Sequence, residues 1–282
     1  MIDETLRTGL NTRSLAKLFL EPTHDPHMIR KAARFIDLTP NERAQLHDLV
    51  RNPLVVTQGT QVQQAGDATD RILIVVSGAL MQATTDAEGR RQSTRFLFPG
   101  DAVGGADMAM RHYASDVTAL TDCRVVEFPK QAFDQADNTR MWRLFFLYRQ
   151  VEQAISNDRA RMLGRGRADE RILHLFLEVN ARQRLTEPRV GDAAWLPVNQ
   201  TMLADATGLT NVYVSKTLSR LRDRQAIATD GPHVIRLINR ERLAERVEFV
   251  DRYADLDPTC AQYAPEGGLT AHGALGGQLP GC

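Results

Sequence analysis

Several features that define other protein classes are scarce or missing in this chain of 282 residues. It has three cysteines, Cys123, Cys260 and Cys282, and their odd number and wide spacing predict neither a disulfide framework nor a zinc site. No apolar run approaches the roughly 20 residues that span a bilayer. The N-terminal residues include early acids and lack the apolar segment of a signal peptide. We therefore expect a cytoplasmic protein with reduced thiols.

The chain also lacks net charge and the histidine pattern of common metalloenzymes. Lys+Arg and Asp+Glu number 35 each, but residues 140–250 hold 19 basic against 13 acidic side chains, an excess of 6. This asymmetry is a modest indication of a basic functional half. No His-x-His sequence occurs, which argues against a cupin-type metalloenzyme. We expect no metal site and no enzymatic activity.

What is present begins with short apolar runs from about residue 36 to residue 129. They are four to six residues long and are broken by turn signals such as "PGD" and "DAEG". Many short strands with frequent turns are typical of a β-sandwich or barrel. Within this region Glu88–Gly89 supplies the tight turn of a predicted hairpin.

A helical period replaces this pattern from Met141 onward. About three heptads run to a break at Leu163–Gly164. The period alone is compatible with a solvated connector, a core helix or a dimer seam. If the helix is a dimer seam, its residues are Leu144, Leu147, Val151, Ala154 and Ile155.

A helix-turn-helix is predicted further along, in "NQTMLADATGLTNVYVSKTLSRLRDRQ". Asn199 and Thr210 are good N-caps, and Gly208 lies where a turn requires positive φ. Val214 and Leu218 are one turn apart and are expected to face the core. In DNA-binding proteins the second helix of such a pair enters the major groove, and the hairpin predicted after it would form a wing.

On that geometry the first turns of the second helix carry the side chains for DNA. Asn pairs with adenine, Lys donates to guanine and Val contacts the thymine methyl group, whereas later arginines lie nearer the phosphates. The alternative is an ordinary helical hairpin with solvated basic residues. The predicted DNA contacts are Asn211, Val212, Ser215, Lys216 and Arg220.

Five segments of the chain are similar, in order, to motifs of the cyclic-AMP receptor protein/fumarate–nitrate regulator (Crp/Fnr) superfamily of bacterial transcription factors. The resemblance covers roughly residues 35–250. It implies an α+β protein with an N-terminal β-roll (jelly-roll) sensor domain, a long dimerisation helix and a C-terminal winged helix-turn-helix. It also implies a homodimer on a palindromic double-stranded DNA operator, with RNA polymerase as a further candidate partner. The segments are "QQAGDATDRILIVVSGAL", "FLFPGDAVGG", "VTALTDCRVVEFPKQAF", "LGRGRADERILHLFLEV" and "GLTNVYVSKTLSRLRDRQAI".

The resemblance also implies a division of the chain into units. An N-terminal extension would precede the sensor domain, and a short C-terminal helix and a tail without fixed structure would follow the DNA-binding domain. The expected ranges are 1–30 for the extension, 31–137 for the sensor, 138–164 for the dimerisation helix, 165–240 for the winged helix-turn-helix, 241–255 for the helix and 256–282 for the tail.

The effector pocket implied by the resemblance departs from the pattern of nucleotide-binding members. Those members have Glu where this chain has Gly105, and Arg followed by Ser or Thr where it has Tyr113 and Ala114. Tyrosine cannot replace the bidentate grip of arginine on a phosphate, and Arg111 lies two residues early. We therefore expect no cyclic-AMP binding, no cofactor and an effector of another kind, in a pocket around Gly104, Gly105, Arg111, Tyr113 and Ala114.

Two function classes compete with a DNA-binding regulator. A non-DNA-binding ligand or interaction module could keep the same fold, and a metalloenzyme would need histidines that this chain does not place together. An iron–sulfur sensor would need a cysteine cluster, and no cysteine occurs before Cys123. The turn glycine and the basic face of the second helix favour the regulator.

Overall fold

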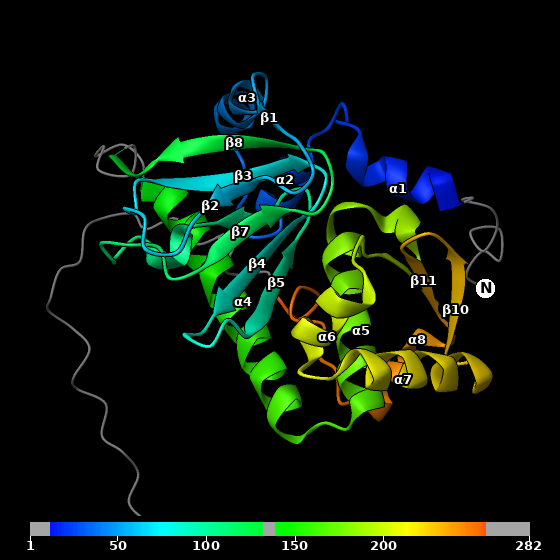
Figure 1. Ribbon diagram of the computed structural model, residues 1–282. Coiled ribbons are helices and arrows are strands. Elements are labelled where there is room, and N and C mark those ends of the chain that lie inside the picture. The colour runs from blue at the N-terminus through cyan, green and yellow to red at the C-terminus, as the bar shows by residue number, and fades with distance from the viewer. Residues whose placement is uncertain (1–11, 132–138, 258–282) are drawn as a thin grey trace, which may run out of the picture.

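The computed structural model describes residues 12–131 and 139–257. Its N-terminal half is a two-layered β-sandwich, and its C-terminal half is a smaller helical unit joined to it by two long helices (Figure 1). The predicted tail from residue 258 onward, with Cys260 and Cys282, lies outside the described residues, as does the start of the predicted N-terminal extension.

The predicted sandwich is confirmed as two four-stranded sheets whose neighbouring strands are all antiparallel. Alternate apolar side chains of both sheets form its core, including Val75, Leu80, Leu97 and Val117. The hairpin predicted at Glu88–Gly89 joins β4 to β5. One sheet has the order β1 (Leu54–Val56), β8 (Cys123–Pro129), β3 (Arg71–Ser77), β6 (Ala102–Val103), and the other has the order β2 (Gln61–Gln63), β7 (Asp116–Ala119), β4 (Leu80–Thr85), β5 (Arg91–Leu97).

Three helices precede the sandwich, and the first two contact the C-terminal half. They are α1 (Thr12–Leu20), α2 (His27–Ala32) and α3 (Pro40–Leu49). Phe19 is fully buried and stacks on Trp195, with ring centroids 5.6 Å apart and planes 4° from parallel. The described part of the segment expected to be an extension, residues 12–30, therefore contributes to the core between the two halves.

The long helix α4 (Thr139–Arg165) runs along the sandwich, and α5 (Ala168–Thr186) returns beside it (Figure 1). The residues predicted for a dimer seam are mostly covered within the same chain. Ile155 is 8% exposed, and Leu144, Leu147 and Val151 pack against the same cluster. The large apolar side chains left exposed on α4 lie on another face, where Phe146 is 60% exposed.

The C-terminal unit contains α6 (Gln200–Thr207), α7 (Asn211–Asp223) and a three-stranded sheet. The sheet has the order β10 (Ile227–Gly231), β11 (Val234–Leu237), β9 (Ala193–Trp195), so the predicted hairpin is present. The helix expected over residues 241–255 ends at Arg246 (α8, Arg240–Arg246). Glu248 then takes a positive φ of 50°, and the chain turns back to bury Tyr253.

Within the described ranges no helix combines the length and the apolar character needed to cross a membrane.

Candidate nucleic-acid interface and sensor cavity

The α6–α7 pair is held by the local features expected from the sequence. The side chain of Asn199 accepts a hydrogen bond from the Met202 amide at 2.9 Å and caps α6. Gly208 ends α6 in the left-handed region, with φ 63° and ψ 35°, where a side chain would be strained. Thr210 then caps α7 by accepting from the Tyr213 amide at 3.3 Å. The predicted caps and turn are therefore confirmed.

Helix α7 buries one face against α5 and α6. Val214 is fully buried, as predicted, whereas Leu218 is only half-buried. The other fully covered positions are Thr217 and Leu221, so the inward stripe runs through 214, 217 and 221. The hydroxyl of Thr217 has no hydrogen-bond partner among the described residues, which is costly for a buried polar group.

The opposite face of α7 carries all five predicted DNA contacts, and each is exposed. The side chain of Asn211 donates to Thr201 Oγ1 at 3.2 Å, which links the start of α7 to α6. The prediction missed Tyr213, which is 57% exposed beside Val212, itself 63% exposed. Its position three residues before Lys216 on a helix was the available signal, because residues three apart share a face.

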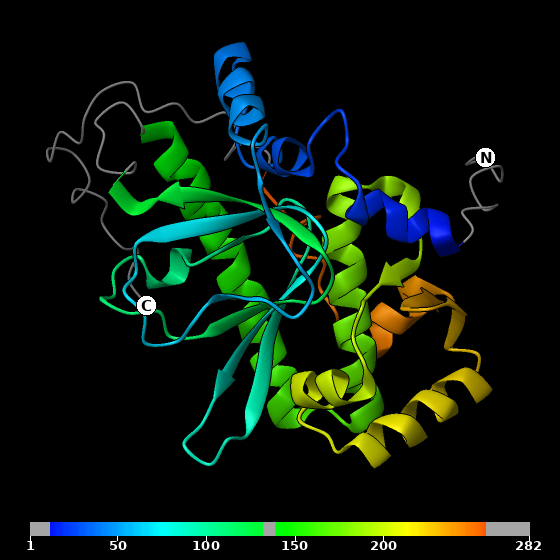
Figure 2. The ribbon, with the colours of Figure 1, turned by 45° about the horizontal axis from the view of Figure 1, so that its top comes forward.

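Basic side chains continue along α7 and onto the wing. Arg220 and Arg222 lie in the last turn of the helix. In the β10–β11 hairpin, Arg236 pairs with Asp230 at 2.6 Å. Helix α7 lies at the outer edge of the molecule, while α6 faces the β4–β5 hairpin (Figure 2). An ion pair of 2.7 Å between Asp205 of α6 and Arg91 of β5 joins the two. This arrangement leaves a basic helix face directed away from the sandwich.

The sensor positions predicted from the family pattern do not converge on one cavity. A Cβ on Gly105 would lie 2.0 Å from Cζ of Phe145, so the α4 side chain occupies the space beside this glycine. Tyr113 is buried and turns toward the start of β3. Its hydroxyl lies 3.1 Å from the Arg71 amide and 3.0 Å from Asp70 Oδ1.

The remaining three predicted positions differ in their surroundings, although a Cβ on Gly104 would lie 3.4 Å from Cε1 of Tyr113. Arg111 and Ala114 are exposed. Gly104 lines a cavity of about 360 Å³ between the β4–β5 hairpin, α4 and α5. Of the five predicted pocket residues, only Gly104 is among the residues lining that cavity.

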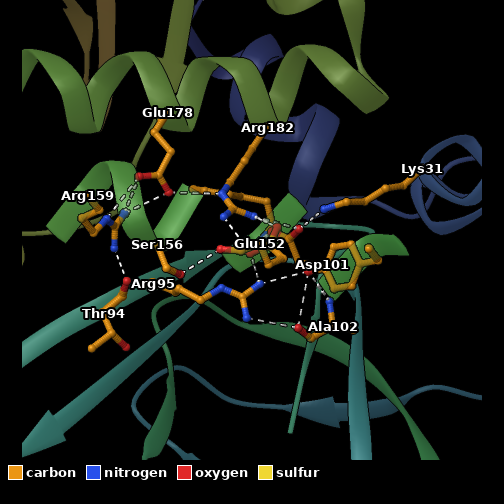
Figure 3. Close-up of polar contacts among 12 residues, drawn as sticks. Lys31, Thr94, Arg95, Asp101, Ala102, Glu152, Ser156, Arg159, Glu178 and Arg182 are labelled. Carbon is orange, nitrogen blue, oxygen red and sulfur yellow. Dashed lines mark hydrogen bonds and ion pairs between the residues drawn. The ribbon is translucent and has the colours of Figure 1, made fainter. Parts of the chain in front are cut away.

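A buried cluster of charged side chains borders the cavity (Figure 3). Glu152 of α4 accepts from Arg182 of α5 at 2.8 Å through both carboxylate oxygens, and from Arg95 of β5 at 2.7 Å. Glu178 pairs with Arg159 at 2.9 Å. The charged residues of the cluster come from α2, the sandwich, α4 and α5, and they are Lys31, Arg95, Asp101, Glu152, Arg159, Glu178 and Arg182.

Charge pairing outweighs burial in this cluster. Burial alone would raise the pKa of Glu152, but the charges of Arg182, Arg95 and Lys31 hold that pKa well below its usual range. Burial raises the pKa of Tyr253, whose hydroxyl donates to Glu152 at 2.5 Å. Sequence reasoning missed these residues. The signal was a set of polar side chains (149, 152, 156 and 159) at helical spacing inside a supposedly apolar seam.

Cys123 is buried in the sandwich core, and its thiol donates to Ala79 O at 3.2 Å. Burial raises its pKa, which keeps the sulfur in its unreactive protonated form. Within residues 12–131 and 139–257, no group of three or more His, Cys, Asp or Glu is arranged to hold a metal ion.

Known families and structures match both halves of the chain. The sequence model of the cyclic nucleotide-binding domain family matches residues 53–139, and that of the Crp-like helix-turn-helix domain matches residues 170–246. The structure of FixK2 from Bradyrhizobium japonicum is 24% identical, covers 69% of this chain and 96% of its own, and superposes with a TM-score of 0.62. This likeness supports the fold.

Two relatives extend the match at the level of sequence. The nitrogen fixation regulation protein FixK of Azorhizobium caulinodans is 27% identical over 209 residues, which are 72% of this chain and 81% of the relative. The transcriptional activator protein FnrL of Cereibacter sphaeroides is 30% identical over 209 residues, which are 66% of this chain and 77% of the relative. With the two family domains in the expected order, the chain belongs to the Crp/Fnr family of DNA-binding transcriptional regulators, which are not enzymes.

Proposed function

We propose that this regulator reads DNA through the exposed face of α7. The observation that carries the proposal is that this helix has one buried face and one exposed face. Val214, Thr217 and Leu221 anchor it, while the predicted contact residues face outward from its capped N-terminal turns. Asn211 and Lys216 would contact base edges, with Val212 and Ser215 beside them. Arg220 would contact phosphate and contribute affinity more than sequence choice.

The proposal includes a homodimer formed through α4. A two-fold dimer places two copies of α7 in successive major grooves and therefore favours a palindromic operator. The helix offers an exposed face that includes Phe146, at 60% exposed, and Trp142, at 40% exposed. We assign the dimer contact to this face, because Leu144, Leu147, Val151 and Ile155 already pack within their own chain, while Ala154 is half-buried.

We propose the same order of units as the sequence suggested, with residues 12–30 assigned to the core through Phe19 and the C-terminal helix ending at Arg246. The regulator would act in the cytoplasm, and RNA polymerase would be the protein partner that it contacts when bound to DNA. Cyclic AMP would not be the effector. Phe145 stands against Gly105, and Tyr113 is engaged with Asp70 and Arg71 instead of facing a phosphate.

The test is binding of purified chain to duplex DNA, measured by fluorescence anisotropy. An inverted-repeat site selected from random duplexes would be compared with a scrambled duplex of equal length and composition. We expect Lys216→Ala and Asn211→Ala each to lower the preference for the selected site by about ten-fold, since one bidentate base contact discriminates by roughly 1–3 kcal/mol.

Arg222→Ala is the matched control on the same helix. Its exposed guanidinium lies near the C-terminal end of α7, where we expect a phosphate contact. Loss of that contact would weaken binding to both duplexes alike and reduce the salt dependence. Equal binding of the selected and scrambled duplexes by the unmodified chain would reject specific regulation. No binding to either would favour a ligand or interaction module.

A further inference from the structure

The cavity beside the buried charged cluster has the composition of an anion site. It measures about 360 Å³, within the range of small-molecule pockets. Of its charged lining residues, four are arginines and one is a glutamate, namely Arg95, Arg149, Arg159, Arg182 and Glu178. Figure 3 shows Arg159 and Arg95 below Glu178 and Arg182 of α5.

Two of these arginines have donors that the protein leaves unused. Arg149 makes no hydrogen bond or ion pair with any described residue, although burial and the nearby charge of Arg95 lower its pKa. The Nε of Arg95 is buried and has no hydrogen-bond partner in the described part of the chain. An unsatisfied buried donor on a charged group is costly, so these groups are poised for a ligand.

The surrounding carboxylates do not balance the arginines. The cations in and around the cavity are Lys31, Arg95, Arg149, Arg159 and Arg182, and the carboxylates are Asp101, Asp107, Glu152 and Glu178. Five positive charges against four negative ones leave one in excess. Three of the carboxylates are already paired to other cations of the cluster. The fourth is Asp107. Burial raises its pKa, which further weakens its electrostatic interaction with Arg149.

A neutral acceptor completes the site. Gln82 lines the cavity, its amide nitrogen donates to Ser115 Oγ at 2.6 Å, and its amide oxygen is buried without a hydrogen-bond partner in the described residues. That oxygen accepts a hydrogen bond and suits a ligand hydroxyl. We infer that the cavity binds a small organic anion that also carries a hydroxyl, with Arg149 and Arg95 Nε on the anionic group and Gln82 on the hydroxyl.

This inference rests on the proposed function and names the ligand chemistry of its sensor. The cavity takes only Gly104 and Ala106 from the segment that faces a cyclic nucleotide in the family pattern, and its other walls are β4, β5, α4 and α5. Helix α5 leads directly into the unit that carries α7. A ligand here contacts the sensor hairpin and the DNA-binding unit at once, so its binding bears on the position of α7.

The experiment titrates the full chain, without DNA, with four probes by isothermal calorimetry. Malate and glycerol 3-phosphate carry both an anionic group and a hydroxyl. Succinate and inorganic phosphate lack the alcohol. Comparing the two carboxylates (malate and succinate) with the two phosphates tells a carboxylate site from a phosphate site. We expect saturable binding of malate or glycerol 3-phosphate, weakened about ten-fold or more in Arg149→Gln through loss of a charge-assisted hydrogen bond.

Arg165→Gln is the matched control, because it removes the same charge from an exposed position on the same helix. It should bind the probe as the unmodified chain does. Arg149→Gln should still fold, since its guanidinium pairs with no described residue. The inference is overturned if none of the four probes binds saturably, or if Arg149→Gln binds as well as the Arg165→Gln control. Loss of DNA selectivity in the unmodified chain would count against the proposed function alone.

Discussion

Glu152 of α4 and Arg182 of α5 form a two-pronged ion pair, with both oxygen–nitrogen distances at 2.8 Å. Both side chains are almost completely buried, at 1% and 2% exposed. The pair joins the long helix to the first helix of the DNA-binding unit, and Tyr253 completes it from the C-terminal segment. The junction between the sensor and the DNA-binding unit is therefore a buried ion-pair cluster inside an apolar core.

Removing one partner of this pair should be strongly destabilising. We expect Glu152→Ala to lower the free energy of unfolding by about 3–5 kcal/mol, because it leaves the guanidiniums of Arg182 and Arg95 buried without their carboxylate. Urea denaturation followed by circular dichroism measures this change. Glu248→Ala is the control, since its 81% exposed carboxylate pairs with Arg161 in solvent and should cost less than about 1 kcal/mol. Equal losses of unfolding free energy in the two variants would contradict the interpretation that the Glu152–Arg182 pair holds the junction together.

The close approach of Phe145 to Gly105 predicts a coupled pair of mutations. Gly105→Ala should destabilise the chain by about 1–3 kcal/mol, because the new Cβ would overlap the ring. Phe145→Ala leaves room for that Cβ, so the double variant should lose less stability than the sum of the two single variants. Thermal unfolding of all four proteins gives the coupling energy. Strict additivity would mean that the ring does not occupy this space.

Stacking of Phe19 on Trp195 should make α1 essential to stability. We expect Phe19→Ala to cost about 3–5 kcal/mol, as for other buried aromatic truncations. It should also change the fluorescence of Trp195. Leu20→Ala is the neighbouring control, because Leu20 is 38% exposed and should cost less than 1 kcal/mol, roughly the effect of a surface substitution. A small effect of Phe19→Ala would show that α1 contributes little to holding the two halves together.

Two buried histidines predict a loss of stability in weak acid. Burial lowers the pKa of His27, whose Nε2 lies 3.0 Å from Leu18 O, and of His174, below the ordinary value of 6.5. Between the folded pKa and 6.5, the unfolded chain binds more protons than the folded one. Stability is therefore full above about pH 6.5 and falls as the pH drops through this window.

The midpoint of thermal unfolding, measured from pH 8 to pH 5, checks this dependence. His27→Gln should flatten the pH dependence in that range, because it removes one of the two buried protonation sites. The exposed His24 offers the matched control, and His24→Gln should leave the slope unchanged. An unchanged slope in His27→Gln would assign the effect to other groups.

The sequence by itself determined the elements that depend on local or periodic signals. The Asn199 and Thr210 caps, the Gly208 turn and the Glu88–Gly89 hairpin could be predicted because neighbouring residues supply both the constraint and its satisfaction. The outward face of α7 followed for the same reason, since a helix fixes which residues share a face. The family resemblance then supplied the order of the units.

Only the tertiary structure decided which covered face of a helix meets which partner. The heptads of α4 could not say whether Leu147 and Ile155 meet a second chain or the same one, because both environments reward the same apolar period. Sequence could not place Glu152 against Arg182, 30 residues away, since that contact depends on how α4 and α5 pack. The unused donor of Arg149 likewise becomes visible only when distant segments close a cavity around it, because burial is what makes an unpaired charge costly.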